Sequence, residues 1–193
     1  MTLFKRFTQF VLLLSALVMV VSTPLQAKER LTFGVVPQQS ATKLARLWGP
    51  FLKQLGELSG YEIRFRTATD IPTFEQRVSL GEYDLAYMNP YHYTVFHRSP
   101  GYMAFAKERD KQIQGIVIVH KDSPITQISD LDKQVVAFPS PGAFAASILP
   151  RAEFARSGID VTPTYVTSHD SVYRAVAAGL KPAGGGVLRT LNR

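Results

Sequence analysis

The chain has 193 residues, of which 46% are hydrophobic and 19% charged, a composition typical of a globular protein. It contains no cysteine, which excludes disulfide frameworks, cysteine-ligated zinc or iron–sulfur sites, thiol catalysis and a lipid-modified N-terminal cysteine. The formal net charge is +7, from 22 Lys and Arg against 15 Asp and Glu. At this length we expect one or two small domains.

Residues 1–27 have the layout of a secretory signal peptide. Lys5 and Arg6 form a basic start, and an apolar run follows over residues 10–21. That run is shorter than the ~20 residues of a membrane-spanning helix, and the small residue Ala27 suits cleavage before Lys28. An uncleaved anchor is the alternative. Cleavage would lower the net charge to +5, because Lys5 and Arg6 leave with the signal. Export of a cysteine-free protein indicates a bacterial periplasm.

Strands and helices then alternate along the first half. Apolar residues recur at three- and four-residue steps over 42–58, as in an amphipathic helix. Asp70 followed by Pro72 is a helix-start signal. The predicted order is a strand at 31–36, a helix at 42–58, a strand at 61–66, a helix at 72–80 and a strand at 83–88. This β-α-β-α-β order indicates an α/β fold with a parallel sheet.

The second half repeats this order. Between the halves we expect a short helix at 91–97, strands at 102–106 and 114–119, and a turn at 121–124. The second set is a strand at 134–138, a helix at 143–156, a strand at 164–166 and a helix at 172–178. In both halves an acid-containing loop precedes a helix that ends at a glycine, Gly81 or Gly179. Chance similarity between common α/β units is the alternative to an internal repeat.

Two similar α/β lobes in an exported protein suggest a binding protein whose ligand lies between them. Loops that leave the carboxyl ends of strands are favoured contact sites, as are clefts between domains. The candidate ligand-binding residues on those loops are Gln38, Gln39, Asp70, Asn89, Tyr91, Ser140, Gly142, Ala143, His169 and Asp170.

Several short motifs, in this order, resemble one known family. They are Phe33-Gly-Val-Val36, Trp48-Gly-Pro-Phe-Leu52, Tyr83-Asp-Leu-Ala86, Lys121-Asp-Ser-Pro124 and Ser168-His-Asp170. Over about 31–179 the chain resembles the periplasmic substrate-binding proteins of phosphate/phosphite/phosphonate-type ABC transporters. The resemblance implies a two-lobed type II periplasmic-binding-protein (Venus-flytrap) fold. It also implies a small ligand and delivery to a membrane permease.

The resemblance implies an anion site at the start of the second lobe's first helix. Phosphonate binders carry three hydroxyl side chains there, whereas this chain has Ala143-Phe144-Ala145. Ile71 likewise replaces an aromatic residue, while His169 matches the family's cleft histidine and Asp170 stands where an acid is usual. Backbone N–H groups over 140–145 remain available, and helix N-termini attract anions. We expect the fold to be retained and the ligand to differ from a simple phosphonate.

Other chemistries find little support in the sequence. His92 and His97 are five residues apart, which is poor spacing for a metal pair on one helix face. His169 and Asp170 lack a nucleophile motif, so we expect no enzyme, no cofactor and no metal. A helix cap is the alternative role for Asp170. The basic residues are scattered, which argues against nucleic-acid binding.

The predicted organisation is a signal at 1–27, a first lobe with the crossover at 28–120, and a second lobe at 121–193. Gly184-Gly-Gly186 lacks the strand and lysine of a phosphate-binding loop, and we expect no strand there. Because relatives continue past this point, we expect a truncated second lobe, with a monomer when full length. The leading interpretation is the substrate-binding component of an ABC importer for a small anionic ligand. A periplasmic sensory module that feeds a membrane signalling protein is the alternative.

Overall fold

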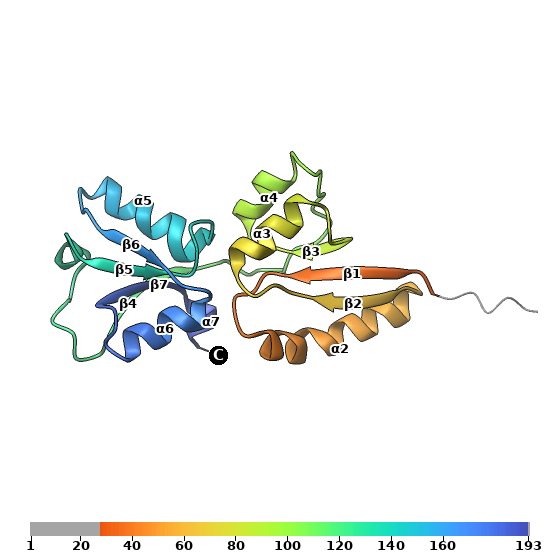
Figure 1. Cartoon of the computed structure of the whole chain (residues 1–193), viewed down its shortest axis with the longest axis horizontal. Coiled ribbons are helices and arrows are strands. Elements are labelled where there is room, and N and C mark those ends of the chain that lie inside the picture. Colours follow the sequence, from red (N-terminus) through yellow and green to blue (C-terminus); the bar gives the residue numbers. More distant parts are fainter. Residues whose placement is uncertain (1–27, 193) are drawn as a thin grey trace, which may run out of the picture.

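The computed structural model describes residues 28–192, which form two α/β bodies side by side along the long axis of the molecule (Figure 1). The predicted signal peptide and its cleavage site at Ala27 lie outside the described residues. Each body has its own sheet, and the chain crosses from the first body to the second once, before β4. Within 28–192, none of the helices combines the length and apolar character that crossing a membrane requires.

The first body is a three-stranded parallel sheet with helices around it. The strands are β1 (Arg30–Val35), β2 (Glu62–Arg66) and β3 (Leu85–Tyr87), in the order β2-β1-β3. The helices are α2 (Ala41–Ser59), α3 (Ile71–Ser79) and α4 (Pro90–Phe96). Phe33 pairs in register with Phe65 on one side and Leu85 on the other. The predicted β-α-β-α-β order and parallel sheet are therefore confirmed in this half.

The helices of this body begin at side-chain caps that lie in the loops after the strands. Ser40, Asp70 and Asn89 accept hydrogen bonds from the backbone N–H groups at the starts of α2, α3 and α4. Such caps satisfy donors that have no partner inside the helix. The caps fix the loops at the carboxyl end of the sheet, where the candidate ligand-binding residues were predicted.

The predicted strand at 102–106 is not present. That segment has no regular secondary structure, and Met103 and Phe105 are exposed. A strand exists only where its N–H and C=O groups pair with a neighbour. Within the described part of the chain, β1 is the one strand that pairs with β3, so the segment has no ladder to join. The β-rich composition of 102–106 was therefore not sufficient to form a strand.

The second body has a four-stranded mixed sheet in the order β4-β7-β5-β6. Its strands are β4 (Gly115–Val119), β5 (Val135–Phe138), β6 (Thr162–Tyr165) and β7 (Ala183–Val187). Its helical segments are η1 (Ile128–Leu131), the π-helix η2 (Phe144–Ile148), α5 (Leu149–Arg156), α6 (His169–Ala177) and α7 (Leu188–Leu191). The parallel trio β6-β5-β7 has the strand order of β2-β1-β3, and β4 runs antiparallel to β7. The division of the chain into lobes at 120/121 remains a prediction. In the structure β4, which precedes that point, pairs with β7 in the second sheet.

The expectation that Gly184-Gly-Gly186 forms no strand is wrong, because these residues make up most of β7. A Cβ on Gly184 would lie 2.3 Å from Val172 Cγ1 of α6. A Cβ on Gly185 would lie 1.9 Å from the Ala146 carbonyl oxygen. Glycine is required here because the helices on both faces approach the backbone of the strand directly. The packing, which the local sequence does not reveal, makes this run a buried strand.

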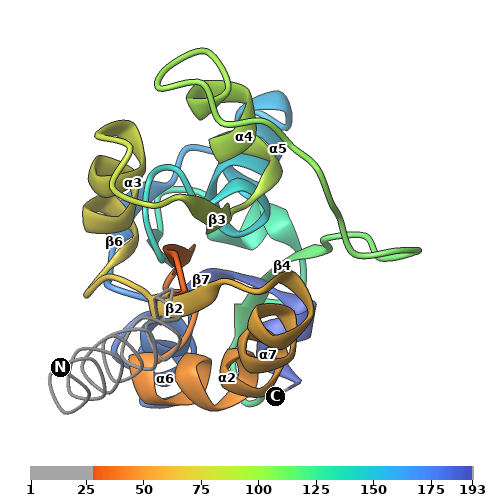
Figure 2. The same cartoon turned by 90° about the vertical axis from the view of Figure 1, so that its right-hand side faces the viewer.

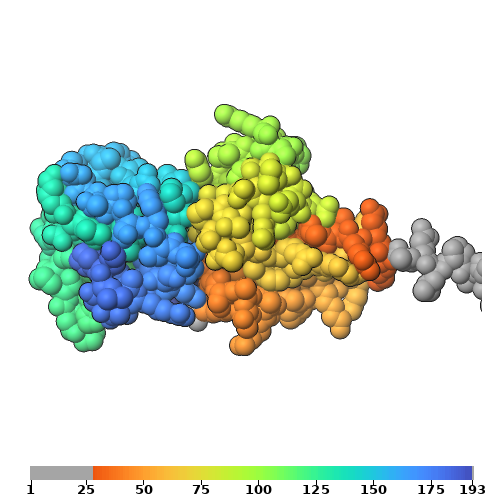
Figure 3. Space-filling model, in the orientation of Figure 1, coloured from red at the N-terminus to blue at the C-terminus, as the bar shows by residue number. Residues whose placement is uncertain are grey.

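The two bodies meet along a buried apolar seam. Phe74 and Val78 of α3 belong to the same buried cluster as Ala143, Ala146 and Val187 of the second body. The space-filling surface shows the two bodies in contact (Figure 3), and in the view along the long axis one body lies behind the other (Figure 2). The carboxyl-end loops of both sheets lie at this junction.

Candidate functional site

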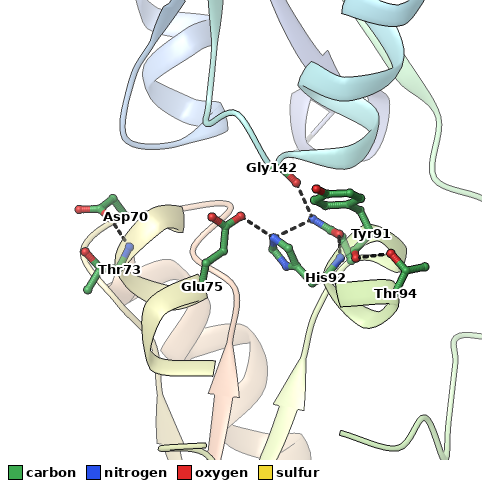
Figure 4. Close-up of polar contacts among 8 residues, drawn as sticks. Asp70, Thr73, Glu75, Tyr91, His92, Thr94 and Gly142 are labelled. Atoms are coloured by element: carbon green, nitrogen blue, oxygen red, sulfur yellow. Dashed lines mark hydrogen bonds and ion pairs between the residues drawn. The ribbon is translucent and has the colours of Figure 1, made fainter. Parts of the chain in front are cut away.

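The candidate site lies where the carboxyl-end loops of the two sheets approach each other (Figure 4). Asn89 follows β3, and Gly142 belongs to the loop after β5. The Asn89 Nδ2 atom donates a hydrogen bond of 3.4 Å to the Gly142 carbonyl oxygen. Two of the residues predicted to bind ligand are thus brought together across the junction. They contact each other directly.

Behind Asn89 lies a polar pair, the buried His92 and the partly exposed Glu75. His92 is 1% exposed, and its Nε2 atom lies 2.8 Å from Glu75 Oε1 and 3.3 Å from Asn89 Nδ2. A carboxylate only accepts hydrogen bonds, so we assign the proton to Nε2, which donates it to Glu75. The Asn89 Nδ2 atom then donates to the Gly142 carbonyl oxygen, while Asn89 Oδ1 accepts from the backbone N–H of His92 at 2.8 Å.

Glu75 was missed by the sequence reasoning, although a signal for it exists. Ile71, Phe74 and Val78 form the buried face of α3, and Glu75 lies within that apolar stripe. A charged residue on the buried face of a helix needs a partner, because burying a lone charge is costly. The five-residue spacing of His92 and His97 argues against a metal pair but gives no indication of the contact with Glu75. Among residues 28–192, no group of three or more His, Cys, Asp or Glu is arranged to hold a metal ion.

The start of the helix formed by η2 and α5 holds a group of unused donors. Within the described residues, the backbone N–H groups of Phe144, Ala145 and Ala146 donate no hydrogen bond. Ser140, in the loop before them, is 1% exposed, and its hydroxyl has no partner in residues 28–192. Ala143 is also buried. Buried polar groups are normally hydrogen-bonded, so a set of free donors at a helix start indicates a place for an acceptor.

His169 lies at the first position of α6, after β6. It is 3% exposed, and its Nδ1 atom has no hydrogen-bond partner in the described part of the chain. Burial lowers the pKa of His169 from 6.5 to about 4, because a charged imidazolium is disfavoured away from water. The ring is therefore neutral at pH 7. The α6 N-cap is Ser168, whose hydroxyl accepts from the Ser171 N–H at 3.1 Å, so Asp170 lies in the first turn and is not the cap.

The other predicted residues differ in how they are placed. Gln39 is 4% exposed and its Nε2 donor has no partner within 28–192, whereas Gln38 is half-buried. Tyr91 is 41% exposed on α4. Asp70 caps α3 by accepting from the Thr73 N–H at 2.8 Å, and that bond lowers the pKa of its carboxyl. Ligand contact by these residues remains a prediction.

A cavity of about 580 Å³ lies away from these loops. Its lining includes His120, Gln134, Gly179 and Lys181. Gln134 precedes β5, and Lys181 comes shortly before β7, so the cavity lies at the amino ends of these parallel strands. Ligands in open α/β sheets bind at the carboxyl ends, which are at the other end of the sheet.

Comparison with known proteins agrees with this geometry. Residues 33–193 match the family model described as ABC transporter, phosphonate, periplasmic substrate-binding protein. A phosphate-import protein PhnD from Mycolicibacterium smegmatis is 24% identical over 175 residues, which are 81% of this chain and 54% of that protein.

Solved structures show the same fold. The chain is similar to PhnD1 from Prochlorococcus marinus, solved with methylphosphonate, with a TM-score of 0.76 and 17% identity over 85% of this chain and 65% of that one. It is also similar to a binding protein of a phosphonate ABC transporter from Pseudomonas aeruginosa, with a TM-score of 0.72 and 17% identity. This match covers 86% of this chain and 60% of that one. The chain thus spans 54% to 65% of the length of these relatives.

The likeness confirms the predicted α/β, two-lobed type II periplasmic-binding-protein fold. The family consists of transporter components that bind substrates, which agrees with the expectation that the chain is not an enzyme. On the match over 33–193, the chain belongs to the family of phosphonate-type periplasmic substrate-binding proteins of ABC transporters.

Proposed function

We propose that this protein is the periplasmic binding component of an ABC importer and that it captures a small phosphate- or phosphonate-type anion between its two lobes. The family description and the phosphate-import relative support this class of ligand. The methylphosphonate in the Prochlorococcus marinus structure supports it as well. Because the chain spans only part of its relatives, the activity of the whole protein is itself a proposal.

One observation carries the proposal: the free donors at the start of the η2–α5 helix. Three consecutive N–H groups, from Phe144, Ala145 and Ala146, have no acceptor within the described residues, and the buried Ser140 hydroxyl is also free. A tetrahedral oxyanion offers several acceptor oxygens to such a group of donors. The helix dipole adds a favourable field at the same place.

This arrangement leaves donors for an anion even though the family's hydroxyl side chains are absent. Ala143-Phe144-Ala145 carries no hydroxyl, so an anion here would be held by backbone donors and by Ser140. A neutral His169 would add a directed hydrogen bond without a charge. We therefore expect the ligand to differ from 2-aminoethylphosphonate, because the hydroxyl side chains that the resemblance implies for phosphonate binders are absent here.

The location and partners follow from the same proposal. Delivery to a membrane permease, a location in the periplasm and a monomeric state when full length are expected of such a carrier. The family description names a transporter component, which favours a carrier over the sensory alternative. The net positive charge of residues 28–193 would also favour encounter with an anion.

Calorimetric titration of the chain with inorganic phosphate, methylphosphonate and 2-aminoethylphosphonate tests the proposal. Ser140→Ala removes one buried donor, and hydrogen bonds to charged groups contribute about 1.5–3 kcal/mol, so we expect Kd to rise roughly 10- to 100-fold. Ser79→Ala is the matched control, because Ser79 is exposed on α3 and donates to Gln76 O. Tight binding of 2-aminoethylphosphonate would contradict the expectation that the ligand differs from it, and equal affinity in both serine variants would contradict the proposed site.

Native mass spectrometry of the protein purified from its own periplasm would identify the ligand independently. We expect a co-purifying species with the mass of a small phosphorus oxyanion. A co-purifying neutral sugar or an amino acid would overturn the assigned ligand class.

A further inference from the structure

The contacts of Asn89 and Gly142 point to a role that does not depend on which ligand is bound. Asn89 uses its Oδ1 atom to cap α4 and its Nδ2 atom to reach Gly142 O in the other lobe. Both ends of its amide are therefore engaged in protein contacts. Asn89 thus resembles a structural link between the lobes more than a free ligand-binding side chain.

Gly142 is the receiving end of this link because a side chain there would collide with the first lobe. A Cβ on Gly142 would lie 2.3 Å from Glu75 Oε1 and 3.2 Å from Glu75 Cδ. Glu75 Oε1 lies 2.8 Å from His92 Nε2, so making room for that Cβ would move the carboxylate away from His92. Glycine at 142 thus lets the two lobes meet here with the Glu75–His92 contact intact.

Glu75 acts on Asn89 through the His92 ring. By accepting the Nε2 proton, Glu75 fixes the ring orientation and tautomer on the buried side of Asn89. Because a protonated Nε2 cannot accept a hydrogen bond, the Asn89 Nδ2 donor is left for the Gly142 carbonyl oxygen. We propose that Glu75, His92 and Asn89 form a latch that closes on Gly142 and holds the two lobes together, with Glu75 as its positioning residue.

The distance between the lobes, measured by pulsed electron paramagnetic resonance, tests the latch. The chain has no cysteine, so Lys53→Cys on α2 and Ala155→Cys on α5 give two unique labelling sites, both exposed. We expect the labelled parent protein to show mainly one short distance. Loss of one hydrogen bond should shift the ratio of open to closed molecules about fivefold.

The variants separate the latch from general stability. Asn89→Asp keeps an oxygen that accepts from the His92 backbone N–H and caps α4, but it places an acceptor opposite Gly142 O, so we expect opening without loss of the helix. Glu75→Ala should open the lobes, whereas Glu75→Gln should restore closure, because its amide oxygen still accepts from His92 Nε2. Combining Glu75→Ala with Asn89→Asp should open the lobes no further than Asn89→Asp alone, because both act on one link.

Matched controls complete the test. Thr94→Ala removes a bond from Thr94 Oγ1 to Tyr91 O on the same helix and should leave the distance unchanged. Gly142→Ala should open the lobes from the other side and increase hydrogen exchange over 139–146. The latch is refuted if the parent is mainly open, or if Asn89→Asp and Gly142→Ala both keep the parent distance. It is also refuted if Glu75→Gln opens the lobes as much as Glu75→Ala.

Discussion

Because His169 is buried in its neutral form, lowering the pH should reduce the stability of the folded protein through this residue. The pKa of this buried ring is about 4, against 6.5 when it is exposed. Between these values the unfolded chain binds a proton that the native state does not, so stability falls as the pH drops from 6.5 to 4 and is unaffected by this group above 6.5. From pH 7.5 to pH 4.5 the loss through His169 amounts to about 2.5 kcal/mol.

Urea unfolding of the parent and of His169→Gln at pH 7.5 and 4.5 measures the contribution of His169 to the free energy of unfolding. The lowered pKa values of the Asp70 and Asp84 carboxyls also cost stability in acid, but they are shared by both proteins and cancel in the difference. We expect the parent to lose about 2.5 kcal/mol more than the variant between the two pH values. Equal losses would show that His169 is solvated or paired, and would refute its assignment as a buried neutral ring.

Two further perturbations test the packing and capping. Gly185→Ala should destabilise the protein by about 3 kcal/mol, because the new Cβ would meet the Ala146 carbonyl oxygen, whereas Gly49→Ala, in open space on α2, should stabilise it by about 1 kcal/mol. Urea midpoints that move together for both variants would contradict this packing. Asp70→Ala should cost about 1 kcal/mol by removing the α3 cap, and Asp70→Asn, which keeps an acceptor for the Thr73 N–H, should restore most of it. A thermal melt unchanged by Asp70→Ala would contradict the cap.

Elements with their own local signals were predictable from the sequence. Asp70 and Pro72 mark the start of α3 in the sequence. The apolar residues of α2 recur at helical spacing over nearly its whole length. Elements that depend on distant partners were not predictable. The β7 glycines form a strand because α6 and η2 pack closely against the two faces of its backbone. Residues 102–106 form no strand because no described strand lies beside them to pair with.

The candidate site was predictable as a set of loops but not as a set of contacts. Strand ends placed Ser140 and His169 at the junction, and the burial of both confirms that these positions are not ordinary surface. Nothing local indicated that Asn89 reaches across to Gly142, or that Glu75 stands behind it through His92. These contacts join residues 53 and 17 positions apart, so they arise from tertiary packing between the lobes and within the first lobe.

The most direct test of the central claim is an amide NMR titration of the chain with phosphate or methylphosphonate. The account predicts saturable shifts that are largest, and downfield, for the N–H protons of Phe144, Ala145 and Ala146, because an anion would accept their free hydrogen bonds. Saturable binding whose largest shifts lie elsewhere, or no binding of either anion, would contradict it.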